Sequence, residues 1–261
     1  MDLTNKIVVI TGGGNGIGKA LAERFAQERV KHLVVADIDM DAADEVARSV
    51  SGTALRVDVS SESQIQNVLD VTEDTVGPID LFCSNAGIAG AADPKASNKD
   101  WQRMWEVNVM AHVYVARHLV PRMINRGGGY LLNTCSAAGL LNQVGGAGYG
   151  VTKHAAVGFG EWVALTHAHE GIRVSLLCPQ AVRTAMTTGQ AAEDAGVKAA
   201  AKDGMIEPSD LAEITVRGLK EEKFLILPHP EVETYMQRKA DDYDRWIAGM
   251  NRFHRSLYER H

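Results

Sequence analysis

Tyr149 and Lys153 lie four residues apart in the segment AGYGVTKHAAVGF, residues 147–159, and together their side chains could handle a proton. A helix places residues four apart on one face, one turn from each other. An ammonium group beside a phenol favours the ionised form of the phenol. On its own, the spacing also fits an ordinary surface turn of helix. The elements around the pair must therefore decide between the two interpretations.

The rest of the chain alternates between short apolar segments and longer segments with helical spacing. The apolar segments resemble strands buried on both faces; they are KIVVI (6–10), HLVVAD (32–37), TALRVDV (53–59), IDLFC (79–83), YLLNT (130–134) and IRVSLLC (172–178). Helical spacing covers residues 16–28, 41–50, 62–76, 100–123 and 148–170. This alternation predicts an α/β fold with a parallel sheet. No linker or internal repeat divides the chain, so we expect one domain over residues 1–261.

The composition narrows the class of protein. The chain is 45% hydrophobic and 23% charged, with a net charge of −6 and no basic stripe, which argues against nucleic-acid binding. Its first apolar run is too short to cross a membrane. The histidines show no metal-binding arrangement; they are His112, His118, His154, His167 and His169. The three cysteines, Cys83, Cys135 and Cys178, are expected to be buried free thiols. We expect a cytoplasmic protein that acts on a small molecule, with no nucleic-acid or membrane partner.

A glycine-rich turn follows the first expected strand. It reads TGGGNGIG, residues 11–18, and a helical segment comes directly after it. Glycines permit a tight turn and let backbone N–H groups approach a pyrophosphate at the positive end of the helix. The second strand ends in Asp37, whose carboxylate could accept hydrogen bonds from ribose hydroxyls and would repel a 2′-phosphate. With no basic side chain at residues 13–15, this favours NAD over NADP as the cofactor.

Two regions depart from the strand–helix alternation. Residues 185–206 are rich in Ala and Gly and form a candidate substrate lid, with a weakly held pair of surface helices as the alternative. Residues 229–261 form a helical tail that we expect to pack on the body or on a partner subunit, or else to line a pocket. The apolar tail residues with helical spacing are Val232, Tyr235, Met236, Tyr243, Trp246, Ile247, Met250, Phe253 and Leu257.

Several further motifs follow the glycine turn in order. They are DV (58–59), SNAG (84–87), Asn108 in WEVNV, Ser136 in NTCSAAG, YGVTK (149–153) and PQAVRT (179–184). With these motifs the chain resembles a short-chain dehydrogenase/reductase of the shorter, soluble type, from residue 3 to about residue 227. The resemblance implies a Rossmann-like doubly wound sheet of about seven parallel strands with helices on both faces. It also implies a nicotinamide dinucleotide at the carboxyl edge of the sheet, and a homotetramer or homodimer.

The resemblance also assigns residues to the cofactor. Asp58 and Val59 would flank the adenine, and the SNAG segment would support the sheet edge. Val182 and Thr184 would hold the nicotinamide carboxamide. The full implied set is Gly12, Gly14, Asn15, Gly16, Ile17, Gly18, Asp37, Ile38, Asp58, Val59, Asn85, Ala86, Gly87, Tyr149, Lys153, Pro179, Val182 and Thr184. Where the family usually has Pro-Gly, this chain has Pro179-Gln180, a departure that bears on the path of the loop.

The same resemblance explains the tyrosine–lysine pair. Hydride transfer from an alcohol carbon also requires a proton to leave its oxygen. Tyr149 would be the general acid/base, and Lys153 would stabilise its phenolate and hold the ribose hydroxyls beside the nicotinamide. The hydroxyl of Ser136 would bond the substrate oxygen as charge develops. Asn108 would anchor a water chain behind Lys153.

The expected pocket wall bears on the substrate. It is mainly apolar and uncharged, and its candidate substrate residues are Leu140, Asn142, Gln143, Ala181 and Met186. We therefore expect an NAD-dependent oxidoreductase for a neutral, fairly hydrophobic secondary alcohol and its ketone. The alternatives are an NADP-linked carbonyl reductase and a catalytically silent NAD-binding regulatory protein.

Overall fold

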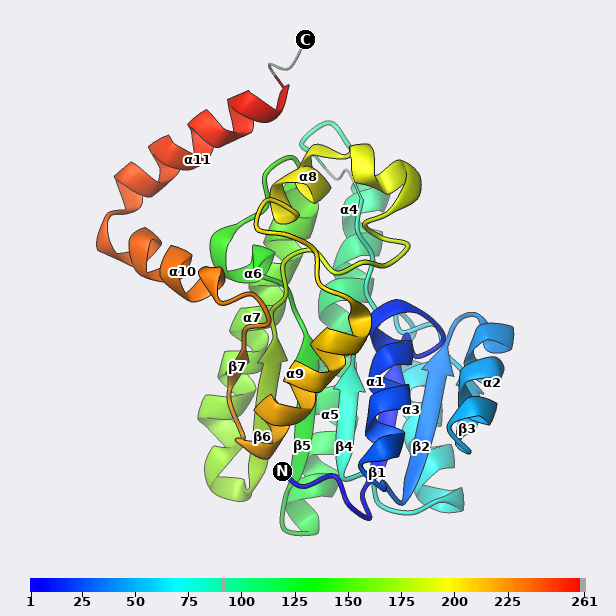
Figure 1. Cartoon of the computed structure of the whole chain (residues 1–261). Helices are drawn as coiled ribbons and strands as arrows, with labels where there is room; N and C mark the ends of the chain where they lie inside the picture. The colour runs from blue at the N-terminus through cyan, green and yellow to red at the C-terminus, as the bar shows by residue number, and fades with distance from the viewer. Residues whose placement is uncertain (91–92, 259–261) are drawn as a thin grey trace.

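The computed structural model describes residues 1–90 and 93–258 and is built on one seven-stranded parallel sheet (Figure 1). The strands are β1 (Ile7–Thr11), β2 (His32–Asp37), β3 (Thr53–Arg56), β4 (Leu81–Ser84), β5 (Gly129–Thr134), β6 (Ile172–Leu177) and β7 (Leu225–Ile226). Their order across the sheet is β3-β2-β1-β4-β5-β6-β7, so the direction of winding reverses between β1 and β4. Ligands of open α/β sheets bind at the carboxyl ends of the strands near such a reversal.

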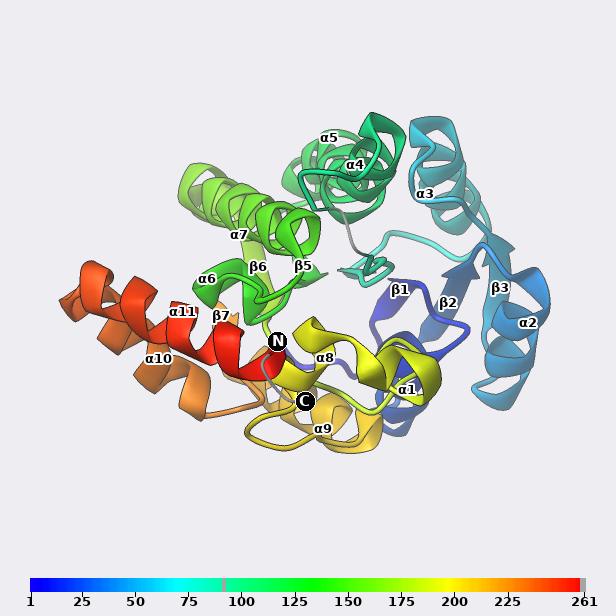
Figure 2. The same cartoon turned by 90° about the horizontal axis from the view of Figure 1, so that it is seen from above.

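Helices cover both faces of the sheet (Figure 2). On one face lie α1 (Gly16–Gln27), α2 (Met40–Ser49) and α9 (Pro208–Lys220); on the other lie α3 (Glu62–Thr75), α5 (Ala111–Asn125) and α7 (Ala147–His167). Each face has its own apolar core, which is why the strands are continuous apolar runs. The predicted Rossmann-like doubly wound fold is confirmed, and the three cysteines are buried and free as expected.

The predicted helix over residues 100–123 is wrong in one respect. The structure divides it into α4 (Asn98–Trp105), a π-helical turn (Glu106–Met110) and α5. A π-helical turn carries an extra residue and is often found at functional sites. Here it contains Asn108, which is fully buried. Apolar spacing does not reveal such a turn, because the segments on either side keep their helical period.

The third strand is shorter than predicted. It ends at Arg56, so Asp58 and Val59 lie in the loop that follows. The physical reason is a local turn, in which the Asp58 carboxylate accepts hydrogen bonds from the backbone N–H and the hydroxyl of Ser60.

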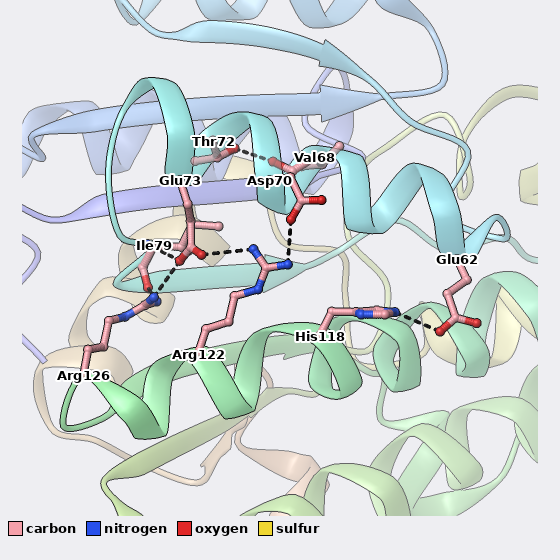
Figure 3. Close-up of polar contacts among 9 residues, drawn as sticks. All are labelled: Glu62, Val68, Asp70, Thr72, Glu73, Ile79, His118, Arg122 and Arg126. Atoms are coloured by element: carbon pink, nitrogen blue, oxygen red, sulfur yellow. Dashed lines mark hydrogen bonds and ion pairs between the residues drawn. The ribbon is translucent and has the colours of Figure 1, made fainter.

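Ion pairs join α3 to α5 along the outside of the sheet (Figure 3). Arg122 reaches both Asp70, at 2.6 Å, and Glu73, at 3.1 Å, and Arg126 contacts the other oxygen of Glu73 at 2.6 Å. Burial alone would raise the pKa of Glu73, but the hydrogen bonds from Arg126 and Arg122 more than offset it, so its pKa lies below the ordinary value. This network fixes α5, which continues from the π-helical turn.

The C-terminal part departs from the doubly wound pattern. A 3-10 turn (Gly189–Glu193) and α8 (Ala195–Ala200) precede α9, and the tail forms α10 (Glu231–Asp241) and α11 (Tyr243–Tyr258). Helix α10 packs against the short helix α6 (Ala138–Leu141) through the buried Val232, whereas α11 has no buried residue and reaches α8 (Figures 1 and 2). Among the described helices, none is both long and apolar enough to cross a membrane.

Candidate active site

A cavity of about 1160 Å³ opens beyond the carboxyl ends of β4, β5 and β6. Its sheet-edge end is lined by Gly87, Ser136 and Tyr149, and residues of α8, α10 and α11 complete its wall. The cavity thus joins the motifs of the sheet edge to the two regions that depart from the alternation.

Tyr149 and Lys153 lie on one face at the start of α7, as their spacing predicts. The Lys153 Nζ atom is 5.7 Å from the centre of the Tyr149 ring and donates a hydrogen bond to the Thr134 carbonyl at 3.0 Å. Lys153 is only 4% exposed, and a buried ammonium group is costly unless its donors are used. Of its three donors, the described residues occupy one, so two can serve the hydroxyls of a ligand.

Ser136 follows β5 and lines the same end of the cavity as Tyr149. Its hydroxyl accepts a hydrogen bond from the Ala138 N–H at 3.1 Å and donates a long one, 3.4 Å, to the Pro179 carbonyl. The first bond fixes the oxygen, and the second is weak enough to be exchanged for a bond to a substrate oxygen. This arrangement suits a group that polarises a carbonyl.

Asn108 holds the backbone behind the lysine. Its side-chain oxygen accepts from the Ile88 N–H, and its amide nitrogen donates to the Ile88 carbonyl, both at 2.9 Å. The same nitrogen donates to the Thr152 hydroxyl at 3.2 Å. The amide thereby ties the segment after β4 to α7. Its expected water chain stays a prediction.

Gln180, which departs from the family pattern, is accommodated by the C-terminal region. The Pro179 carbonyl still accepts from the Ala137 N–H at 2.9 Å. The Gln180 N–H donates to Nδ1 of the buried His229 at 3.1 Å, and its side-chain nitrogen donates to Asp203 at 3.2 Å. The side chain therefore extends toward Asp203 while the backbone remains next to Ser136.

The glycine turn lies at the other side of the sheet edge, between β1 and α1. Gly12 has a φ of +63°, and a Cβ on it would lie 2.9 Å from the Ala86 Cα. A Cβ on Gly18 would lie 2.0 Å from the Gly12 carbonyl oxygen, so this helix start requires glycine. The Asn85 amide donates to the carbonyls of Thr11 and Gly12, which ties the turn to β4.

The turn fits a dinucleotide. The Asn15 side chain makes no cap hydrogen bond with the described residues, so the first N–H groups of α1 can receive an anion. The Asp37 carboxylate, at the end of β2, accepts from the Gly14 N–H at 2.9 Å and thus lies against the turn, where ribose hydroxyls would be bound. The donors of the turn, this carboxylate and the two available donors of Lys153 match a nicotinamide dinucleotide.

Other predicted cofactor residues lie along the same carboxyl edge of the sheet. Ile38 is half exposed beside Asp37, and the Thr184 methyl group would lie 3.2 Å from a Cβ on Gly16. Val182 is buried and pairs with Ile206. Asp58 lies farther along the edge, 3.5 Å from Arg103. Burial would raise the Asp58 pKa, but the Ser60 hydrogen bonds and the Arg103 charge more than offset it, so the pKa is lowered.

Four of the five predicted substrate residues line the cavity: Asn142, Gln143, Ala181 and Met186. Leu140 instead packs on the apolar cluster beneath α10, and its neighbour Leu141 lines the cavity. In the single helical turn of α6, adjacent residues point in different directions, so Leu140 lies outside the cavity lining. Met186 comes from residues 185–206, whose movement as a lid stays a prediction.

The C-terminal tail forms one wall of the cavity. From the sequence, this is the second of the two interpretations of the tail, after packing on the body or on a partner subunit. The apolar residues Tyr235, Trp246, Met250 and Phe253 line the cavity. Their helical spacing indicated an apolar face, but not which surface it covers. No group of three or more His, Cys, Asp or Glu in the described parts of the chain could hold a metal ion. Burial, and then the charge of Lys153, lower the pKa of His112 to about 3, so this buried histidine is neutral at pH 7.

Comparison with known proteins bears on this geometry. The family model described as short chain dehydrogenase matches residues 6–195. The chain belongs to the short-chain dehydrogenase family. It is 32% identical over 257 residues to 1-deoxy-11-beta-hydroxypentalenate dehydrogenase of Streptomyces exfoliatus, covering 95% of this chain and 92% of that protein. It is 35% identical over 193 residues to meso-2,3-butanediol dehydrogenase of Serratia marcescens, covering 72% of this chain and 76% of that enzyme.

A solved structure extends the likeness over nearly the whole chain. The short-chain dehydrogenase/reductase from Burkholderia phymatum in complex with NAD superposes with a TM-score of 0.84 at 29% identity, covering 94% of this chain and 96% of the other. Membership of the family makes this protein an oxidoreductase, a short-chain alcohol dehydrogenase or ketone reductase that uses NAD or NADP.

Proposed function

We propose that this protein is an NAD-dependent oxidoreductase that interconverts a hydrophobic secondary alcohol and its ketone. The observation that carries the proposal is the meeting of Ser136 and Tyr149 at one end of a cavity, with Lys153 buried beside the tyrosine ring. Both relatives described above are dehydrogenases named for alcohols, a butanediol and a hydroxypentalenate, which supports the substrate class.

Each side chain has a separate part in the proposed reaction. When bound, the nicotinamide supplies the acceptor or donor of hydride. The Tyr149 hydroxyl takes the proton from the alcohol oxygen, or returns it to the ketone oxygen. Lys153 favours the ionised phenol by its charge and binds ribose hydroxyls through its two available donors. The Ser136 hydroxyl orients the substrate oxygen and stabilises charge on it.

The preference for NAD rests on Asp37. Its carboxylate lies against the Gly14 N–H, where a 2′-phosphate would meet a negative charge. The residues around the reactive end, among them Gly87, Leu141 and Ala181, are uncharged, so the reacting part of the substrate is taken to be neutral.

The proposal includes the oligomeric state of the protein and its place in the cell. We expect a homodimer or homotetramer, supported by Trp162 and Leu165 of α7, which are 55% and 84% exposed. Such apolar exposure is typical of an interface. The three free thiols fit the reducing cytoplasm.

The test is a screen of aryl, alicyclic and steroid alcohols with NAD and with NADP, measured by initial rates of NADH or NADPH absorbance. Tyr149→Phe should lower turnover at least about 100-fold while dinucleotide binding, measured by calorimetry, survives. Asp37→Ala should weaken NAD binding and improve NADP binding. Tight NAD binding without any turnover would favour the silent regulatory protein, and faster turnover with NADP would favour the carbonyl reductase.

A further inference from the structure

The part of the cavity wall that comes from α10 and α11 carries three exposed arginines. They are Arg238 of α10 and Arg245 and Arg252 of α11, each seven residues from the next. Seven residues make about two helical turns, so Arg245 and Arg252 share one face of α11. Trp246, Met250 and Phe253 line the same cavity, which therefore combines an apolar wall with guanidinium groups.

Several other arginines of the described residues have carboxylate partners that these three lack. In the body, Arg24, Arg122 and Arg126 each contact a carboxylate within 3 Å. Among the described residues, no carboxylate lies within ion-pair distance of Arg238, Arg245 or Arg252; Arg238 contacts the Tyr235 ring at 5.8 Å. Their donors remain available to a ligand.

The acidic residues of the cavity are mostly engaged elsewhere. Asp203 accepts hydrogen bonds from the Tyr235 hydroxyl and the Gln180 amide, and Asp194 accepts from the first N–H groups of α8. Asp242 accepts from the Arg245 N–H. Asp241, exposed at the end of α10, is the remaining carboxylate that lines the cavity. These carboxylates keep their charge, and Lys202 adds a fourth cation to the lining, so the three arginines are distinguished by unused N–H donors and not by an excess of positive charge.

We infer that the substrate carries a carboxylate apart from its alcohol group, bound by Arg245 and Arg252 with Arg238 on the adjoining helix. Guanidinium groups match carboxylates because two parallel N–H donors meet two oxygens. A cavity of about 1160 Å³ exceeds the usual range for small ligands and has room for a multi-ring hydroxy acid. This inference rests on the proposed function, and it adds an anionic group to a substrate whose reacting end is neutral.

The test compares alicyclic and steroid hydroxy acids with their methyl esters, which keep the shape but lack the charge. For the unmodified enzyme with NAD, we expect kcat/KM to be at least about tenfold higher for an acid than for its ester. This is the effect expected when the ester loses one hydrogen bond between charged groups. Arg245→Gln and Arg252→Gln should remove this preference by raising KM for the acid, with kcat and the ester unaffected. Arg255→Gln is the matched control, because it removes a charge from α11 at a residue that does not line the cavity.

Calorimetric binding to the NAD-bound enzyme separates the two proposals. If acids bind more tightly than esters, and the arginine variants lose the difference, but no NADH forms, the carboxylate site stands and the proposed oxidation is wrong. If acids and esters bind equally and are oxidised equally, the oxidation stands and the carboxylate site is wrong. The inference is also overturned if no acid in the panel binds more tightly than its ester. It is overturned as well if Arg255→Gln weakens acid binding as much as Arg245→Gln and Arg252→Gln do.

Discussion

Behind the reactive end of the cavity, Asn108 is fully buried and Lys153 is 4% exposed, whereas no residue of α11, which forms part of the outer wall, is buried. The first end is assembled from β5, the π-helical turn and α7, each tied to the sheet. The second is one exposed helix joined to the body through α10 and α8. Elements with few buried contacts open most readily. The contrast indicates that the reacting groups are held firmly, while the residues that choose the substrate lie on the least anchored part.

The largest expected effect comes from changing the buried end. Lys153→Met removes the charge beside Tyr149 and leaves the Thr134 carbonyl without its partner. We expect kcat/KM to fall about 1000-fold, measured by initial rates. Near-ultraviolet circular dichroism checks that the fold is kept. Unchanged kinetics in a folded variant would show that the firmly held end is not where the chemistry takes place.

A second change tests how the buried end is supported. Glu73→Gln weakens the contacts of α3 with Arg122 and Arg126 and should lower the free energy of unfolding by about 1–3 kcal/mol. Because the folded Glu73 pKa lies below 4.5, its contribution is present above that pH and is lost as the pH falls through the folded pKa. Urea unfolding at pH 7 and pH 3 should therefore show a larger difference at pH 7 than at pH 3. Glu23→Gln, on an exposed face of α1, is the control.

Removing α11 tests the weakly anchored end. A chain that stops after Asp242 loses Trp246, Met250 and Phe253 from the cavity wall. We expect KM for a hydrophobic alcohol to rise about tenfold, because that wall no longer excludes water. Thermal unfolding of the body should change little, since α11 contributes no buried residue. A large drop in the melting temperature would contradict the contrast between the two ends.

The smallest effect is expected from one methyl group in α11. A Cβ on Gly249 would meet the Arg252 guanidinium at an ordinary 3.8 Å, so Gly249→Ala should stabilise the helix by about 0.5–1 kcal/mol. Amide hydrogen exchange in α11 should slow, with global stability unchanged. The same substitution at Gly18 should instead destabilise the protein, because its Cβ would collide with the Gly12 carbonyl. If Gly249→Ala and Gly18→Ala changed the stability equally, the contrast between the exposed α11 and the buried end would be wrong.

Most of the fold could be predicted from the alternation of apolar and helical segments, because strands covered on both faces must be continuously apolar. The cofactor edge could be predicted from the glycine turn and Asp37, since backbone approach to a phosphate restricts which residues fit. The π-helical turn at Asn108 could not, because an extra residue in one turn leaves the surrounding period intact. Nor could the position of Leu140 outside the cavity lining, since orientation within one turn depends on what packs behind it.

By itself, the sequence determined the sheet, the dinucleotide motifs and the four-residue spacing of Tyr149 and Lys153. These follow from local geometry, which is set by neighbours along the chain. Only the tertiary structure decided that the tail completes the cavity and brings Arg245 and Arg252 to the wall of the cavity that Tyr149 also lines. An amphipathic helix has an apolar face whatever it covers, and the surface that it covers is chosen by packing between segments far apart in the chain.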